Sequence, residues 1–230
     1  MNKTFKIGHR GAKGYAPENT LMAFQKAVDM AVDGIELDVH LSLDGAIMVI
    51  HDTTIDSTTN GKGVVNKLSL QELKSFRINE TQDTRIPTLE EVFDLVNQQC
   101  FINIELKNYE TADVVVALIE KYVSEKNWNY ADFLVSSFDW NALQQVVFLN
   151  EKIPIGVLTA TDLELAIAFA KFIKAKSIHP YFHLLTEENT ALMQEKGFEV
   201  FTWTVNETED IQTIKLLNPN GIITDFPDRI

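Results

Sequence analysis

The chain has 230 residues, of which 45% are hydrophobic and 23% charged, as expected for one soluble globular domain with a substantial core. Its formal net charge of −13 argues against a nucleic-acid partner and against anionic membranes, because both attract basic surfaces. No apolar run approaches the roughly 18 residues of a membrane span, and Cys100 is the single cysteine, which excludes an intrachain disulfide.

The chain enters its first predicted strand almost at once. Residues 1–11, MNKTFKIGHRG, contain no apolar core of the kind that defines a signal peptide. We therefore expect a cytoplasmic protein. Composition leaves the oligomeric state open, and a homodimer is compatible with it.

Short apolar runs rich in isoleucine and valine alternate with segments of helical periodicity. The predicted strands are residues 5–10, 34–39, 101–107, 132–138, 153–159, 176–180, 199–205 and 221–225. The predicted helices are residues 17–32, 88–99, 110–126, 139–150, 162–174, 186–196 and 207–218. This alternation predicts a parallel sheet that closes into a (β/α)8 TIM-type barrel, with residues 1–230 as a single α/β domain.

One segment interrupts the alternation after the second strand. A further extended run, 46–51, follows too closely for a parallel crossover, and Asp44-Gly45 is a typical hairpin turn. A two-residue turn there would place Asp38 directly opposite His51. We interpret residues 40–87 as this hairpin followed by a small insertion over the barrel mouth.

Three carboxylates occupy the inward face of two predicted strands. Glu36 and Asp38 are two residues apart on one strand, and Glu105 and Lys107 repeat that spacing on the next. Converging carboxylates repel one another unless a cation lies between them, and oxygen ligands favour Mg²⁺ or Ca²⁺. The alternative is a set of salt bridges, with Lys107 and Arg10 neutralising Glu36 and Glu105.

His9 and His51 end two different extended runs and are expected at the same mouth. A histidine pair near neutrality suits a general acid and a general base. Zinc ligation is the alternative, but the closely spaced ligand pairs of many zinc sites are missing. His179, which precedes Pro180, is better explained as a hydrogen-bonded structural residue.

Further polar side chains adjoin this mouth. Arg10 offers a planar fork for a phosphate and Lys107 a point charge. Glu18 and Asn19 precede a predicted helix, where they could support the site, although capping also accounts for Asn19. Three aromatic residues near strand ends are candidates for an apolar pocket wall, although core packing is the more frequent role of such residues: Phe138, Trp203 and Phe226.

In this order, these residues resemble the glycerophosphodiester phosphodiesterase family. The motifs that carry the resemblance are HRG (9–11), PENT (17–20), GIELDV (34–39), HD (51–52), TTNGKG (58–63), IPTLEEV (86–92) and NIELK (103–107), with weaker similarity in SSF (136–138), TWTVN (202–206) and GIITDFP (221–227). The resemblance spans nearly the whole chain.

The resemblance implies a (β/α)8 barrel with an insertion after the second strand and hydrolysis of a glycerophosphodiester to glycerol 3-phosphate and an alcohol. It also implies a divalent ion held by Glu36, Asp38 and Glu105, acid–base roles for His9 and His51, and phosphate contacts from Arg10 and Lys107. The substrate would be a small molecule such as glycerophosphocholine or glycerophosphoethanolamine.

Other functions remain open at this point. A lysophospholipase D or phospholipase would use the same barrel but should need an apolar rim, whereas residues 52–87 are mostly polar. A non-catalytic binding module should have lost a histidine or carboxylate. A metal-dependent sugar-phosphate isomerase or aldolase is a third alternative.

Overall fold

The computed structural model describes residues 3–79, 81 and 83–230, and the strands form a closed barrel. Residues 1, 2, 80 and 82 of the predicted domain and insertion lie outside the described residues. The parallel strands follow the order β1-β9-β8-β7-β6-β5-β4-β2, and a β1–β2 pairing closes the ring. Their bounds are β1 (Phe5–Gly8), β2 (Gly34–Leu41), β4 (Phe101–Leu106), β5 (Phe133–Ser137), β6 (Ile155–Thr159), β7 (Ser177–Pro180), β8 (Glu199–Thr202) and β9 (Gly221–Thr224). This ring confirms the predicted TIM-type barrel.

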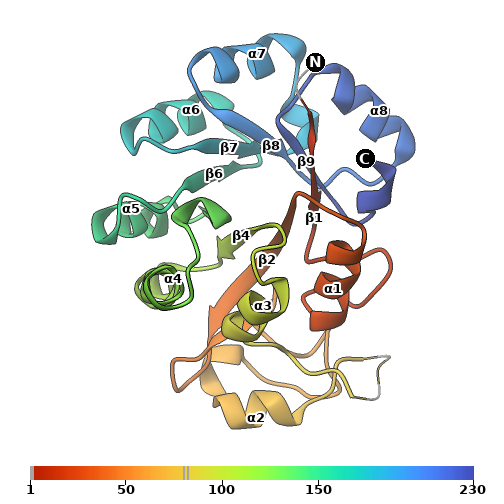
Figure 1. Cartoon of the computed structure of the whole chain (residues 1–230), viewed down its shortest axis with the longest axis vertical. Helices are drawn as coiled ribbons and strands as arrows, with labels where there is room; N and C mark the ends of the chain where they lie inside the picture. Colours follow the sequence, from red (N-terminus) through yellow and green to blue (C-terminus); the bar gives the residue numbers. More distant parts are fainter. Residues whose placement is uncertain (1–2, 80, 82) are drawn as a thin grey trace.

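Helices surround the barrel (Figure 1). They are α1 (Leu21–Asp29), α3 (Leu89–Val96), α4 (Ala112–Glu125), α5 (Trp140–Leu149), α6 (Leu163–Phe172), α7 (Glu187–Glu195) and α8 (Thr208–Leu216). The main core lies between these helices and the outward face of the strands, to which Ile35, Leu37 and Val39 contribute. Because side chains alternate along a strand, the residues between them point into the barrel.

The first helix begins later than the sequence pattern predicts. Thr20 caps α1 by accepting a hydrogen bond from the Ala23 amide at 3.1 Å, so Pro17, Glu18 and Asn19 precede the helix. Asn19 has a left-handed φ of 54°. The capping role therefore belongs to Thr20, and the side chains of Glu18 and Asn19 are available elsewhere.

Strand β3 (Ile47–Val49) pairs antiparallel with β2, as the hairpin prediction requires. The predicted register is wrong by one residue, because Val39 pairs with Val49 and the Ile50 amide donates to the Asp38 carbonyl at 3.0 Å. The loop contains three residues, 43–45, and ends on Gly45 with φ 83°, a common three-residue hairpin geometry. Asp38 is therefore not opposite His51. The regular strand ends at Val49, so its alternation does not fix the direction of the His51 side chain.

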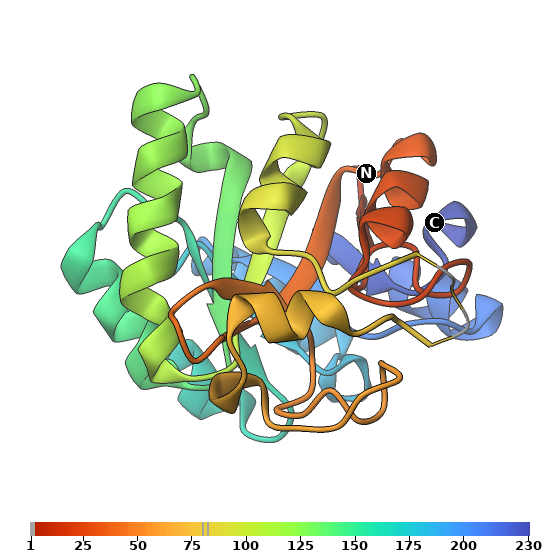
Figure 2. The same ribbon diagram turned by 90° about the horizontal axis from the view of Figure 1, so that it is seen from below.

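The segment after this hairpin has a small core of its own. It contains α2 (Leu70–Ser75) and the 3-10 turn Val65–Lys67. Together with Met48 of β3, the buried apolar residues of this core are Ile50, Ile55, Val65, Leu73, Ile78 and Ile86. The segment lies beside α1 and α3 in Figure 1, and Figure 2 shows it crossing the near side of the molecule.

Inside the barrel, His179 is fully buried and serves the fold. Its Nε2 is 2.8 Å from the Ser177 hydroxyl, and its ring packs on Phe201 with centroids 5.4 Å apart. The ring fills the space over Gly156, where a Cβ would lie 2.5 Å from Nε2. Burial lowers the pKa of His179 to about 3, so the ring is neutral at pH 7.

We expect His179 to make the protein sensitive to mild acid. Below its ordinary pKa of 6.5, the unfolded chain binds a proton that the folded chain rejects until about pH 3. This group should therefore lower the free energy of unfolding by about 1.4 kcal/mol for each pH unit below 6.5. Urea unfolding of the His179→Gln variant should give a shallower pH slope between 6.5 and 5. The exposed His183 provides the matched control, since His183→Ala should keep the wild-type slope. Equal slopes in all three proteins would contradict this account.

Candidate active site

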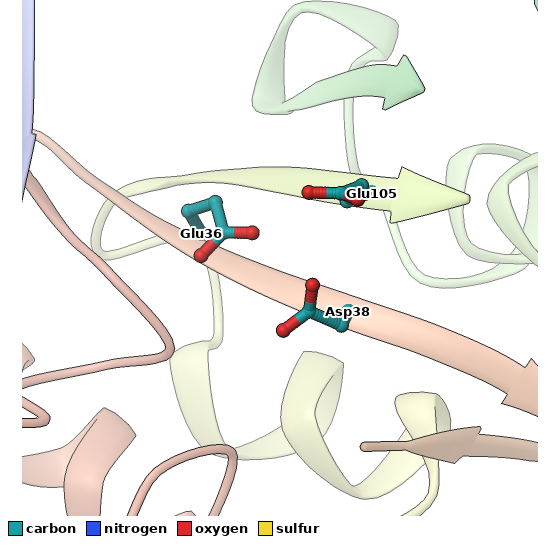
Figure 3. A group of neighbouring side chains, drawn as sticks. All are labelled: Glu36, Asp38 and Glu105. Carbon is teal, nitrogen blue, oxygen red and sulfur yellow. The ribbon is translucent and has the colours of Figure 1, made fainter. Parts of the chain in front are cut away.

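Glu36, Asp38 and Glu105 converge at the mouth of the barrel (Figure 3). Asp38 on β2 is the ladder partner of Glu105 on β4, so the two side chains are neighbours on one face. One oxygen from each of the three carboxylates lies within 4.8 Å of the others. Glu36 and Asp38 are only 4% and 1% exposed. The strands therefore assemble the acidic cluster that the sequence spacing predicted.

Two cations neutralise part of this acidic cluster. Lys107 Nζ lies 2.6 Å from Glu105 and 3.2 Å from Asp38. The guanidinium of Arg10 approaches Asp38 at 3.3 Å. Glu36 instead accepts the Arg10 backbone N–H at 3.0 Å and lies 4.0 Å from His9 Nε2. Salt bridges with lysine and arginine thus balance the charges of Asp38 and Glu105, but Glu36 has no such salt bridge among the described residues.

The electrostatics of the cluster differ among its members. Burial, and then the neighbouring charges of Asp38 and Glu105, hold the pKa of Glu36 well above its usual range. Burial and the charge of Asp38 raise the pKa of Glu105 to about 7. Burial also acts to raise the pKa of Asp38, but Lys107 and Arg10 outweigh it and hold that pKa low. Three buried carboxylates against two cations fit an additional positive charge, and a hard divalent cation suits the oxygen donors.

The end of β1 brings His9 and Arg10 to the same mouth. The strand ends at Gly8, and Arg10 and Gly11 then have positive φ values of 50° and 85°. A Cβ on Gly11 would lie 2.6 Å from the Ala23 carbonyl carbon, so this close turn requires glycine. The turn releases Arg10 from strand alternation, as its predicted position required.

His9 is held by an aspartate that was not singled out in the sequence. Its Nδ1 lies 2.6 Å from Asp225, which also accepts from Asn206 Nδ2 at 2.8 Å. Burial acts to raise the pKa of Asp225, but the hydrogen bond and charge of His9 outweigh it, so that pKa is lowered. An ionised Asp225 accepts from Nδ1–H and leaves Nε2 as the free nitrogen. The sequence feature that points to this contact is an acidic residue directly after strand β9.

His51 repeats this arrangement after the β2–β3 hairpin. Its Nδ1 lies 2.8 Å from Asp52, which accepts from the Ser57 hydroxyl at 2.6 Å. The hydrogen bond from Ser57, followed by that from His51, lowers the pKa of Asp52. His40 Nε2 bonds the His51 carbonyl at 3.1 Å and fixes the backbone there.

Glu18 and Asn19 contact the residues of the mouth. Glu18 accepts from Arg10 Nη1 at 2.7 Å and pairs with Lys13 at 3.0 Å. Asn19 donates from Nδ2 to Asp38 at 2.9 Å. Both side chains thus orient groups that face the cluster.

These groups surround a cavity of about 120 Å³. Phe138 and Trp203 form part of its wall, with ring centroids 5.4 Å apart in an edge-to-face contact. Phe226 does not line it, because its ring packs against Tyr15 and under the Arg229 guanidinium. The remaining lining residues are His9, Arg10, Glu36, His51, Asn103, Glu105, Lys107, Ser136, Leu158, Thr204 and Ile223.

A wider groove of about 670 Å³ adjoins this cavity. Arg10 lines both spaces, and Asp52, the partner of His51, lines the groove. The groove lies between the turn after β1 and the segment that follows the hairpin, with Tyr15, Thr58 and other residues in its walls. The sequence does not predict that the cavity and the groove are two distinct spaces.

A closed parallel barrel with acidic and basic side chains at the carboxyl ends of its strands is the architecture of a TIM-barrel enzyme. The model of the glycerophosphoryl diester phosphodiesterase family matches residues 9–229, and the chain belongs to this family.

Relatives support this assignment along the whole chain. A glycerophosphodiester phosphodiesterase of Bacillus altitudinis is 39% identical, covering 100% of this chain and 96% of its own. One from Caldanaerobacter subterraneus subsp. tengcongensis is 36% identical, covering 99% and 96%. A phosphodiesterase of Oleispira antarctica, whose structure is a complex with the product sn-glycerol 3-phosphate, superposes with a TM-score of 0.88 at 26% identity, covering 97% and 94%. In the described part of the chain, no helix combines the length and apolar character needed to cross a bilayer.

We expect a divalent cation to stabilise the fold through the acidic cluster. Adding Ca²⁺ or Mg²⁺ to chelator-treated protein at 100 times the dissociation constant should raise the free energy of unfolding by about 2.7 kcal/mol. Glu36→Gln and Glu105→Gln should lose most of this gain, because each removes a candidate ligand. Without the ion, Glu36→Gln should be at least as stable as the wild type, because a like-charge repulsion is gone, whereas Glu105→Gln also loses its ion pair with Lys107.

Thermal unfolding with and without chelator measures both effects. Glu90→Gln is the control, since Glu90 pairs with Lys121 at an exposed position and should leave the response unchanged. Equal cation responses in the wild type and in both cluster variants would contradict a site at these carboxylates.

Proposed function

We propose that the protein hydrolyses glycerophosphodiesters, such as glycerophosphocholine or glycerophosphoethanolamine, to glycerol 3-phosphate and an alcohol. The observation that carries this proposal is the pairing of two histidines with a carboxylate cluster around one cavity. Each histidine bonds an aspartate through Nδ1, and both line the cavity that Glu36 and Glu105 also line. The names of the relatives and the bound product of the Oleispira antarctica enzyme give independent support.

Glu36, Asp38 and Glu105 would hold a divalent cation, Mg²⁺ or Ca²⁺, whose positive charge would favour negative charge on the phosphoryl oxygens. Arg10 and Lys107 would bind non-bridging oxygens. Arg10 has five N–H donors, of which its contacts with Glu18 and Asp38 use only part. These fixed donors would stabilise the charge that develops in the transition state.

His9 and His51 would move the two protons of the reaction. Asp225 and Asp52 each hold a proton on Nδ1, which leaves Nε2 for the substrate. One Nε2 takes the proton of the attacking oxygen, which is water or the substrate's own 2-hydroxyl. The other gives a proton to the departing alcohol oxygen as its bond to phosphorus breaks.

The remaining side chains would orient the substrate and the charged groups. Phe138 and Trp203 would pack against the carbon atoms of the substrate. Glu18 would fix the Arg10 guanidinium, and Asn19 would fix Asp38. We propose that the whole chain acts as one domain in the cytoplasm, with residues 40–87 forming one side of the mouth.

The proposed reaction is tested by the release of glycerol 3-phosphate. The purified protein is incubated with glycerophosphocholine, glycerophosphoethanolamine and lysophosphatidylcholine, with and without chelator. We expect release from the first two, loss of release with chelator, and recovery with Mg²⁺ or Ca²⁺. Release of choline from lysophosphatidylcholine alone would instead indicate a lysophospholipase D.

We expect His9→Ala and His51→Ala each to lower kcat by roughly two or more orders of magnitude, the scale of general acid–base catalysis. Melting temperatures should change little, because both side chains face the cavity rather than the main core. His183→Ala controls for the loss of a histidine outside this site. Parallel losses of activity and melting temperature would favour a structural role.

A further inference from the structure

Two polar atoms in the wall of the inner cavity have no partner. Asn103 is 2% exposed and Ser136 is fully buried. Neither Asn103 Oδ1 nor the Ser136 hydroxyl has a hydrogen-bond partner among the residues that the structure describes. Both residues line the cavity of about 120 Å³. The acid–base and phosphate-binding roles proposed above use neither of them.

Strand register places both residues against the acidic cluster. Asn103 on β4 is the ladder partner of Glu36 and lies two residues before Glu105, on the same face. Ser136 on β5 is the ladder partner of Glu105. Asn103 and Ser136 are therefore neighbours of the cluster on its β4–β5 side.

An unpaired buried polar atom is unfavourable for folding unless a ligand completes it. The neighbouring Ser137 shows the usual arrangement, because its buried hydroxyl donates to the Leu106 carbonyl at 2.6 Å and accepts from the Asp139 amide at 2.9 Å. Ser136 has no such contact, although it lies on the same strand. The Ser136 hydroxyl and the side-chain amide oxygen of Asn103, Oδ1, can therefore bond a polar group inside the cavity.

The sizes of the two spaces indicate which part of the substrate this polar group belongs to. The inner cavity measures about 120 Å³ and the outer groove about 670 Å³. Arg10 lines both, so a phosphate bound there would lie at their junction. The small cavity suits the invariant glycerol half of the substrate, and the wider groove can accept alcohols of different size.

We propose that Asn103 and Ser136 together bind the terminal hydroxyl of the glycerol half and so select glycerophosphodiesters over diesters without this hydroxyl. This inference rests on the proposed function. Asn103 Oδ1 accepts a hydrogen bond, and the Ser136 hydroxyl donates or accepts, so the pair matches uncharged hydroxyls without adding charge. A site built to bond a substrate hydroxyl rejects an analogue that lacks it, because its buried polar atoms are then left unpaired.

The test compares two substrates in the ion-loaded enzyme. One is glycerophosphocholine, and the other is the phosphocholine ester of 1,2-propanediol at its primary hydroxyl, which lacks only the terminal glycerol hydroxyl. The wild type should prefer glycerophosphocholine in kcat/KM. Ser136→Ala and Asn103→Ala should lower kcat/KM for glycerophosphocholine by roughly tenfold, mainly through KM, and leave the analogue nearly unchanged. The preference should therefore fall by the same factor.

Ser137→Ala is the matched control on the same strand. It should lower the melting temperature, because it removes two hydrogen bonds, yet keep the substrate preference. Ser136→Ala should keep or raise the melting temperature, because the hydroxyl that it removes has no partner.

Calorimetric titration with Ca²⁺ separates hydroxyl binding from ion binding. Asn103→Ala should bind the ion as tightly as the wild type. Weaker ion binding with an unchanged substrate preference would make Asn103 an ion ligand and overturn the inference. If the wild type releases glycerol 3-phosphate but both variants keep its preference, this inference alone fails. No release by the wild type from any glycerophosphodiester overturns the proposed function and this inference together.

Discussion

The organisation of the mouth depends on one electrostatic constraint, the burial of three carboxylates on two adjacent strands. Glu36, Asp38 and Glu105 are brought together by the ladder between β2 and β4 rather than by loops. Their mutual repulsion is strong where water is excluded. Lys107 and Arg10 pair with Asp38 and Glu105, whereas among the described residues Glu36 has only the Arg10 backbone N–H and His9 Nε2, 4.0 Å away, as polar neighbours. The cluster thus has three carboxylates against two cations, and Glu36 is the carboxylate without a lysine or arginine side chain beside it.

This constraint explains why so many neighbouring side chains are fixed. Arg10 can approach Asp38 only because the turn after Gly8 reverses the chain, and Glu18 then holds its guanidinium from the other side. Asn19, which precedes the helix because Thr20 caps it, donates to the same Asp38 oxygen that Arg10 approaches, Oδ2. Arg10, Lys107 and Asp38 therefore have fixed orientations before a substrate arrives, which is the requirement for electrostatic catalysis.

Much of this arrangement follows from spacing in the sequence. Alternation along strands predicted the barrel and the convergence of the carboxylates, because strand periodicity is local and the parallel ladder then aligns neighbouring strands. The hairpin was predicted, but its predicted register was wrong by one residue, since Asp44-Gly45 is compatible with two- and three-residue loops that differ by one residue in pairing. Bonds of the Asp44 carboxylate to the Ser42 hydroxyl and the Leu70 amide accompany the longer loop. The contact with Leu70 is distant in sequence and was therefore invisible there.

Other features depend on contacts that no local pattern encodes. Asp225 meets His9 only because β9 closes the barrel beside β1, and the two residues are 216 positions apart. Phe226 follows a strand as Phe138 and Trp203 do, yet its ring lies outside the cavity against Tyr15. Residue type alone does not suggest the proposed roles of Asn103 and Ser136, because most buried polar side chains find a hydrogen-bond partner within the protein. Their distinction is a missing partner, which only three-dimensional structure reveals.

The interior of the barrel is apolar at one end and charged at the other. This arrangement strengthens the electrostatic interactions of the site. At the end where the strands begin, the rings of Phe5, Phe101 and Phe201 contact one another with centroids about 6 Å apart. Ile7 and Leu134 belong to the same apolar cluster. The charged groups lie beyond it, at the strand ends. This apolar cluster excludes water from the end of the barrel where the strands begin. The charged groups at the other end therefore interact in a medium of low polarisability. The same apolar cluster makes unpaired polar atoms beside the carboxylates more unfavourable, so Glu36, Asn103 and Ser136 can gain further polar partners only from the open mouth.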